Sequence, residues 1–199
     1  MINSKITIEP RVIQHLGQDL ITSPEVAVTE LLKNSIDARI EGKVCEINIH
    51  LFNSAQSAMH STQYNSVPAN NLFDGIAENL KNVPLCVIED NGVGMTPDVL
   101  KMGYLSVGTD RKKDQGNSLG EKGIGRLSTQ RLGKAVIVET VSDHILSVMQ
   151  LDWERIISGQ YDVQIHDSFS NSDSYTRIWI LGINLGDFLD IEDHLPIIR

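Results

Sequence analysis

The chain has 199 residues, of which 41% are hydrophobic and 22% are charged, and its 26 acidic and 17 basic residues give a formal net charge of −9. This composition argues against a disordered chain, and the length is sufficient for one domain with a hydrophobic core. No apolar run approaches the roughly 20 residues that cross a bilayer, and no signal-peptide stretch begins the chain. We therefore expect a soluble, cytoplasmic protein with no membrane partner. The acidic balance argues against a generally basic nucleic-acid-binding surface but leaves contact through a local basic patch open.

The first half of the chain predicts one long helix, one strand and an irregular excursion. Ser23 and Pro24 are typical of a helix N-cap and first helical position, and the predicted helix runs to about residue 40. Residues 43–52 alternate between apolar and polar, which predicts a strand. Residues 53–82 are rich in Asn, Ser, Gln and Ala, and only 72–80 has a helical pattern. Thirty residues are long for a connection, so we interpret 53–82 as an insertion, with a variable surface loop as the simplest alternative.

The second half of the chain predicts one helix, a glycine-rich segment and several strands. In order, we expect a strand over 85–89, a helix from 97 to about 105, the glycine-rich segment over 108–125, a short helix over 126–132, and strands over about 135–142, 145–153, 161–166 and 175–183. Helices followed by consecutive strands predict an α+β fold, with a mixed β-sheet and helices on one face.

The cysteines and histidines show no metal-binding or disulfide pattern. Cys45 and Cys86 lie in separate apolar runs without CxxC spacing, and the six histidines lack HxxxH or HExxH spacing. Both cysteines are therefore expected to be reduced core residues, and no transition-metal site built by the protein is expected.

Polar residues recur along the first predicted helix. Glu30, Lys33, Asn34 and Asp37 follow the spacing i, i+3, i+4 and i+7, which places them in one stripe. An ordinary amphipathic helix turns such a stripe to water. The alternative is that Glu30 and Asn34 face a ligand pocket, one as a proton acceptor and the other as a neutral oxygen donor for Mg²⁺.

A second cluster, DNGVGM over residues 90–95, follows the predicted strand over 85–89. Such a run is most often a tight turn. It also suits a flat ligand, because Asp90 can accept hydrogen bonds from an exocyclic amine and Met95 can pack on an aromatic face. Gly92 and Gly94 would allow a close backbone approach.

The positive charge of the chain is concentrated in the glycine-rich region. Residues 110–134 carry seven cations and three anions, a net charge of +4, so the rest of the chain carries −13. The run GEKGIG over 120–125 precedes the short predicted helix, where exposed backbone N–H groups and Lys122 would suit a phosphate. A solvated basic loop is the alternative. The run is neither a Walker A loop nor a Rossmann turn.

In order and spacing, the three clusters resemble the ATP-binding domain of the GHKL superfamily, which includes gyrase B, the large heat-shock chaperone, histidine kinases and MutL. Residues 30–38 (ELLKNSIDA) resemble the N-box E-x-x-x-N-x-x-D-A, residues 90–95 match the adenine box D-x-G-x-G-M, and residues 120–125 resemble the glycine-rich lid. Thr176 is a partial match to the late threonine box, because Ser174 and Tyr175 precede it where a glycine is usual. The resemblance spans about residues 12–183 and implies a Bergerat-type two-layer sandwich.

The resemblance also implies roles for individual residues. Glu30 would be the general base that orients water against the γ-phosphate of ATP, Asn34 would ligate Mg²⁺, and Asp90 would hold the adenine amino group. The other implied nucleotide-binding residues are Asp37 and Ala38 at the base and wall of the site, Gly92, Gly94 and Met95 against the ring, Thr176 in the water network beside Asp90, and Gly120, Glu121, Lys122, Gly123, Ile124 and Gly125 in a lid over the phosphates.

For the whole chain, the resemblance implies a Mg²⁺-dependent ATPase whose lid closure and homodimerisation drive an attached effector or protein partner. The nearest branch is the chaperone, MutL and MORC group, and a bacterial defence, DNA-repair or chaperone-like system is implied. Residues 1–199 would be a single ATP-binding domain, the N-terminal part of a longer protein, with slow turnover on its own. An ATP-sensing interaction module with negligible turnover and a histidine-kinase-type ATP domain remain alternatives. The 22 residues before Ser23 leave little room for a phosphoacceptor helix.

Overall fold

Six strands form one sheet in the order β1-β2-β6-β3-β4-β5 within the residues described, and every neighbouring pair is antiparallel. The structure is a computed structural model that describes residues 21–64, 72–105, 128–159 and 163–187. The strands are β1 (Ile47–Phe52), β2 (Leu85–Asp90), β3 (Ala135–Ser142), β4 (Ile145–Asp152), β5 (Gln164–Phe169) and β6 (Tyr175–Leu181).

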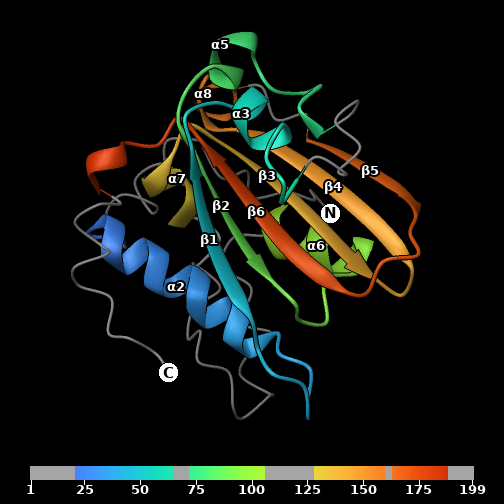
Figure 1. Cartoon of the computed structure of the whole chain (residues 1–199). Coiled ribbons are helices and arrows are strands. Elements are labelled where there is room, and N and C mark those ends of the chain that lie inside the picture. The colour runs from blue at the N-terminus through green and yellow to red at the C-terminus, as the bar shows by residue number, and fades with distance from the viewer. Residues whose placement is uncertain (1–20, 65–71, 106–127, 160–162, 188–199) are drawn as a thin grey trace, which may run out of the picture.

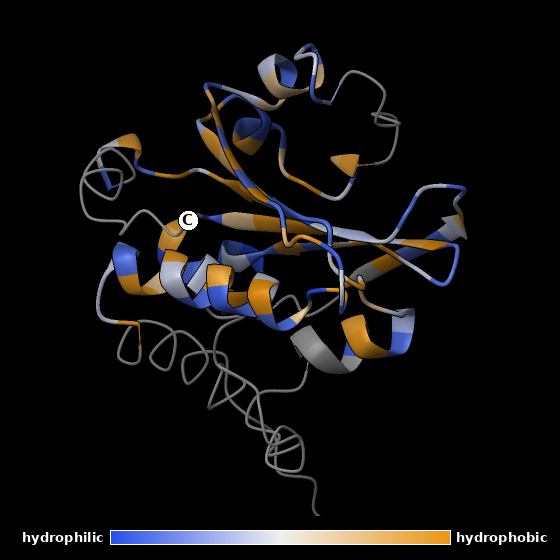
Figure 2. Ribbon diagram, turned by 60° about the horizontal axis from the view of Figure 1, so that its bottom comes forward, coloured by the Kyte–Doolittle hydropathy of each residue, from blue (hydrophilic) through white to orange (hydrophobic). Residues whose placement is uncertain are grey.

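Helices lie on both sides of this sheet (Figures 1 and 2). They are α2 (Pro24–Asp37), α3 (Ala55–Met59), α5 (Glu78–Lys81), α6 (Pro97–Leu105), α7 (Ser128–Leu132) and α8 (Trp153–Ile157). None of the helices in the described ranges has the length and apolar character needed to span a membrane.

The long helix α2 begins where the sequence predicts and ends earlier. The Ser23 side chain accepts a hydrogen bond from the Val26 N–H at 3.4 Å, and Pro24 occupies the first turn. The helix ends at Asp37, not near residue 40. At the next residue, the Ala38 carbonyl accepts the Val93 N–H at 2.8 Å, so a tertiary contact takes the place of a further helical turn.

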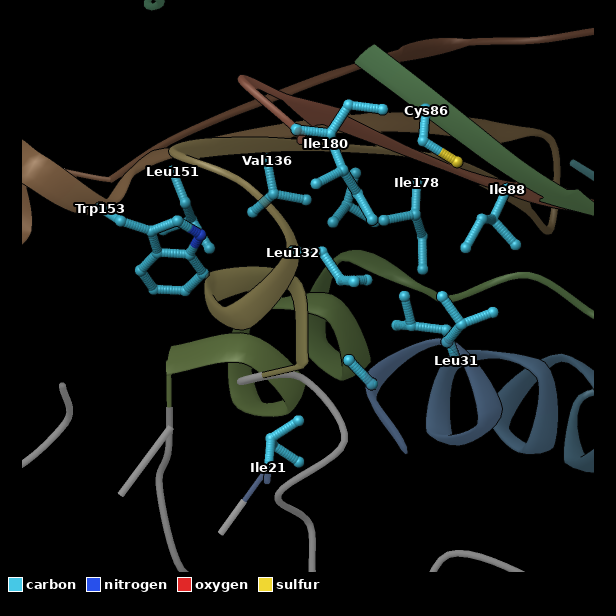
Figure 3. Close-up of a cluster of buried hydrophobic side chains, with 14 of the residues drawn as sticks. Ile21, Leu31, Cys86, Ile88, Leu132, Val136, Leu151, Trp153, Ile178 and Ile180 are labelled. Atoms are coloured by element: carbon cyan, nitrogen blue, oxygen red, sulfur yellow. The ribbon is translucent and has the colours of Figure 1, made fainter. Parts of the chain in front are cut away.

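The main hydrophobic core lies between the sheet and α2. Ile88 of β2 and Ile178 of β6 point from the sheet toward Leu31 of α2, as Figure 3 shows. Leu31 and Ile88 are each 1% exposed, and this degree of burial corresponds to about 2 kcal/mol of transfer free energy for each side chain. The core therefore packs α2 against the face of the sheet that includes β2 and β6.

The second face of the sheet is covered by parts of the 53–82 segment. Tyr64 packs on Trp179 of β6 with ring centroids 4.8 Å apart, and the same buried cluster includes Phe73, Ile76 and Leu80. The described part of this segment is therefore a structural cover of the sheet. Figure 2 shows the sheet between this cover and the layer that contains α2.

These observations confirm the predicted α+β class and correct two details. The sheet is antiparallel where a mixed sheet was predicted, because each strand pairs in the opposite direction to its neighbours. Helices cover both faces of the sheet, whereas the sequence predicted helices on one face. The reason is that β2, β3 and β6 have apolar side chains on both faces, and each face is covered.

A buried polar network crosses three strands on the second face. Glu139 of β3, 2% exposed, accepts hydrogen bonds from Tyr175 Oη at 2.6 Å, Arg177 Nη1 at 3.0 Å and Trp179 Nε1 at 3.0 Å. Arg177 also pairs with Glu89 of β2 and lies 4.4 Å from the centroid of the Tyr175 ring. Burial alone would lower the pKa of Arg177, but the Glu139 and Glu89 carboxylates outweigh burial and raise it.

Arg177→Met is expected to lower the free energy of unfolding by about 3 kcal/mol, because it leaves the Glu139 carboxylate buried without its cation. Urea unfolding measures the loss. Arg131→Met is the matched control at an exposed position and should change stability by less than about 0.5 kcal/mol. The double variant Arg177→Met/Glu139→Gln should recover part of the loss, and equal losses in the Arg177 and Arg131 variants would contradict this account.

Candidate nucleotide-binding site

Three polar side chains form a row across the neighbouring strands β2, β6 and β3, on the face of the sheet that α2 covers. Asp90 of β2 lies opposite Thr176 of β6, and Thr176 lies opposite Thr140 of β3. Directly opposite residues in antiparallel strands point to the same face, so these side chains share one side. The structure therefore brings together two predicted site residues, Asp90 and Thr176, that are 86 positions apart in the sequence.

Asp90 is buried, and each of its carboxylate oxygens accepts one hydrogen bond. It is 4% exposed, and its Oδ2 accepts the Ser35 hydroxyl at 2.8 Å while its Oδ1 accepts the Gly92 N–H at 3.0 Å. Burial raises the pKa of Asp90, and these two hydrogen bonds oppose that effect by favouring the charged form. An ionised carboxylate accepts about four hydrogen bonds, so Asp90 can accept further donors from a ligand.

The loop after Asp90 is pressed between the end of α2 and β3. A Cβ at Gly92 would lie 2.5 Å from the Ala38 carbonyl oxygen, and one at Gly94 would lie 1.9 Å from the Val141 carbonyl oxygen. Gly94 also has φ +68°, a left-handed conformation that favours glycine. The two glycines of this loop are thus required by close packing against the Ala38 and Val141 carbonyl groups.

Met95 joins this loop to the polar row. Its N–H donates to Thr140 Oγ1 at 2.9 Å, and its partly buried side chain packs against the main core. Thr140 is fully buried and was not among the predicted site residues. A threonine within the apolar strand 135–142 is a weak signal by itself, and only the register of β3 against β6 places it beside Thr176.

The polar stripe of α2 is half-buried. Glu30 forms an ion pair with Lys33 at 2.8 Å, with side chains 25% and 39% exposed, and Asn34 and Asp37 are also partly buried. Ser35, which the helical pattern assigns to the apolar side, is the α2 residue that contacts Asp90. The sequence offers one signal for this contact: Ser35 is a hydroxyl residue on the side of the helix that buries Ala27, Val28 and Leu31.

The lid residues predicted from the glycine-rich run, 120–125, lie outside the described residues. The described part of the predicted site therefore consists of the α2 stripe, the Asp90 loop and Thr176. It contains no group of three or more His, Cys, Asp and Glu side chains that could hold a metal ion.

A shallow cavity of about 480 Å³ opens mainly on the second face of the sheet. It is lined mostly by polar residues of β1, β2, β6 and the loops beside them, among them Asn48, Glu89, Asn91, Tyr175 and Arg177. Glu89 and Arg177 belong to the buried network of that face, whereas Ser35, Thr140 and Thr176 do not line the cavity. The cavity therefore shares Asp90, but not Thr176 or Thr140, with the row on the face that α2 covers.

Residues 21–177 match the family described as histidine kinase-, DNA gyrase B-, and HSP90-like ATPase. A comparison with curated proteins gives no match. The matched residues contain α2, the Asp90 loop and Thr176, and they make up well over half of the chain. The chain therefore belongs to the histidine kinase-, gyrase B- and HSP90-like ATPases.

Proposed function

We propose that this chain is a Mg²⁺-dependent module that binds and hydrolyses ATP. The observation that carries the proposal is the arrangement at Asp90, a buried carboxylate with spare acceptor capacity next to a closely packed glycine loop. A buried acceptor at the end of a strand suits the exocyclic amino group of adenine, and Met95 and the glycine backbone would lie along the ring.

The two helical residues Glu30 and Asn34 are proposed to act at the phosphates. They are four positions apart on α2, which places them on one face, and both are half-buried. Glu30 would accept a proton from the water whose oxygen forms a bond to the γ-phosphorus, while the bond from that phosphorus to the bridging oxygen breaks and ADP leaves.

Asn34 is the proposed protein ligand for Mg²⁺. A single neutral amide oxygen fits a site in which Mg²⁺ keeps its other oxygen ligands from phosphates and water, and the described residues hold no acidic cluster that would bind the ion alone. When bound, Mg²⁺ neutralises charge on the phosphates.

The remaining parts of the proposal concern the whole protein. Residues 120–125 would close over the phosphates as a lid, and closure with homodimerisation would drive an effector or partner. Residues 1–199 would form one ATP-binding domain with 53–82 inserted, and the chaperone, MutL and MORC branch is the one whose motifs it most resembles. A slow turnover by this chain alone is expected.

A titration of the wild-type chain with MgATP, followed by measurement of phosphate release, tests the proposal. Saturable binding with slow release of phosphate supports it. Binding without phosphate release, also when full-length protein and partners are present, would select an ATP-sensing module. An acid-labile phosphoprotein after incubation with labelled ATP would select a kinase domain, and the absence of binding would contradict all three.

A further inference from the structure

The hydroxyl of Thr140 uses its complete hydrogen-bonding capacity. Its oxygen lies 2.9 Å from the Tyr175 carbonyl oxygen, 2.9 Å from the Met95 nitrogen and 3.1 Å from Thr176 Oγ1. A hydroxyl has one hydrogen to donate and two lone pairs to accept with. The Tyr175 carbonyl can only accept and the Met95 N–H can only donate, so the Thr140 hydrogen goes to Tyr175 and one lone pair goes to Met95.

The direction of the remaining contact follows from this assignment. Since the only hydrogen of Thr140 is committed to the Tyr175 carbonyl, the contact between the two threonines requires Thr176 to donate. Thr176 therefore directs its hydrogen at Thr140, away from any ligand. Its oxygen keeps lone pairs only for a group that approaches the row.

Asp90 lies opposite Thr176 and, like Thr176, can only accept a hydrogen bond from a ligand. Its carboxylate already accepts from Ser35 and from the Gly92 N–H, and when ionised it has no hydrogen to donate. Both side chains that would face the base are thus acceptors. Where both acceptors face the substituent at position 6 of a purine, they bind the two N–H groups of an amino substituent. An oxo substituent would instead turn its lone pairs toward theirs, a mismatch that buried polar sites penalise strongly.

We propose that Thr140 is a positioning residue that sets the base preference of the site, because it takes the hydrogen of Thr176 and so makes the site accept 6-amino purines and reject 6-oxo purines. This inference rests on the proposed function, since it assumes that a purine nucleotide binds with the substituent at position 6 of its base against both Asp90 and Thr176. Thr140 itself acts through Thr176 and through the Met95 backbone.

The experiment compares the affinities of ATP and inosine triphosphate, which has an oxygen at position 6 where ATP has an amino group. Wild type is expected to prefer ATP strongly. Thr140→Val keeps the shape of the side chain but frees the Thr176 hydroxyl to rotate and donate, so the ratio of the two Kd values should fall about tenfold. Thr140→Ser keeps the hydroxyl and should retain the wild-type ratio. Asp90 accounts for the preference that remains in Thr140→Val.

Two further variants separate this role from a loss of packing. Ser147→Ala removes another fully buried hydroxyl, directly opposite Thr140 on β4, whose 2.7 Å hydrogen bond goes to Asp167, and it should leave the ratio unchanged. In a Thr176→Val background, Thr140→Val should have no further effect on the ratio. If Thr140→Val is not folded, Thr140→Cys gives the same comparison, because a thiol is a weak hydrogen-bonding group.

A merely structural role of Thr140 would weaken binding of both nucleotides alike, and an unchanged ratio in folded Thr140→Val or Thr140→Cys would overturn the inference. A wild-type chain that binds ATP and inosine triphosphate equally would also overturn it while leaving ATP binding intact. Failure of the wild type to bind either nucleotide would instead contradict the proposed function.

Discussion

Asp90→Asn is expected to weaken MgATP binding about 100-fold and to leave the folded chain at least as stable as wild type at pH 7. Hydrogen bonds to a charged group are worth about 1.5–3 kcal/mol, and the amide would also turn a donor toward the amino group of adenine. The fold tolerates the change because Asn can still accept the Gly92 N–H and can donate to the Ser35 hydroxyl.

The stability part of this prediction follows from the sign of the pKa shift. Burial raises the pKa of Asp90 in the fold, so this group contributes stability that is present below its unfolded pKa of about 3.9 and is lost as the pH rises through the folded value. The Asn variant has no such loss. The free energy of unfolding of Asp90→Asn, relative to that of wild type, should therefore be higher at about pH 7 than at about pH 4. Urea unfolding of both proteins at the two pH values measures this difference.

Asp143→Asn is the matched control for Asp90→Asn. Asp143 is exposed in the turn between β3 and β4 with φ 51°, a left-handed conformation that Asn also tolerates. This variant should keep wild-type affinity for MgATP. Unchanged affinity in Asp90→Asn, or a loss explained by unfolding, would remove Asp90 from the proposed site.

Local sequence signals predicted the local backbone structure on which the candidate site is built. The N-cap at Ser23, the helical spacing of Glu30 and Asn34, and the glycines after Asp90 are signals that depend on neighbouring residues. The structure has a helix at the first two and a loop after Asp90. The strand 145–153 was likewise predicted to within one residue at its end, because alternation is also a local property.

The features that the sequence did not predict depend on the pairing of strands that are far apart in the chain. The row of Asp90, Thr176 and Thr140 depends on strand register, which joins segments more than 30 residues apart. The predicted strand over 161–166 is observed as β5, Gln164–Phe169, where pairing with β4 sets the limits. The short helix α3 is stabilised by its Ser54 capping box and by packing on the second face of the sheet. The sequence has no helical periodicity there that would predict it.

Ser35 of α2 is a further residue whose burial could be predicted from the sequence but whose partner could not. Its position among apolar residues predicts burial correctly, since it is 3% exposed. The sequence alone does not show which partner satisfies its hydroxyl, because that partner, Asp90, comes from β2. Buried hydroxyls on a core-facing stripe therefore identify candidate positioning residues, whereas their targets require the fold.

Glu30→Gln is expected to reduce phosphate release at least 100-fold while MgATP affinity changes less than about threefold, because a positioned general base contributes about 10²–10⁴ in rate. The fold should survive, since the substitution keeps the shape and breaks only the partly exposed ion pair with Lys33, worth about 0–1 kcal/mol. Lys33→Gln is the matched control: it breaks the same ion pair and keeps the carboxylate, so phosphate release should stay within about threefold of wild type. Equal losses in the two variants would assign the effect to the ion pair, and undiminished release in folded Glu30→Gln would exclude Glu30 as the base. Because binding and turnover are measured on the same samples, retained affinity with lost release would place Glu30 at the chemical step and not in ground-state binding.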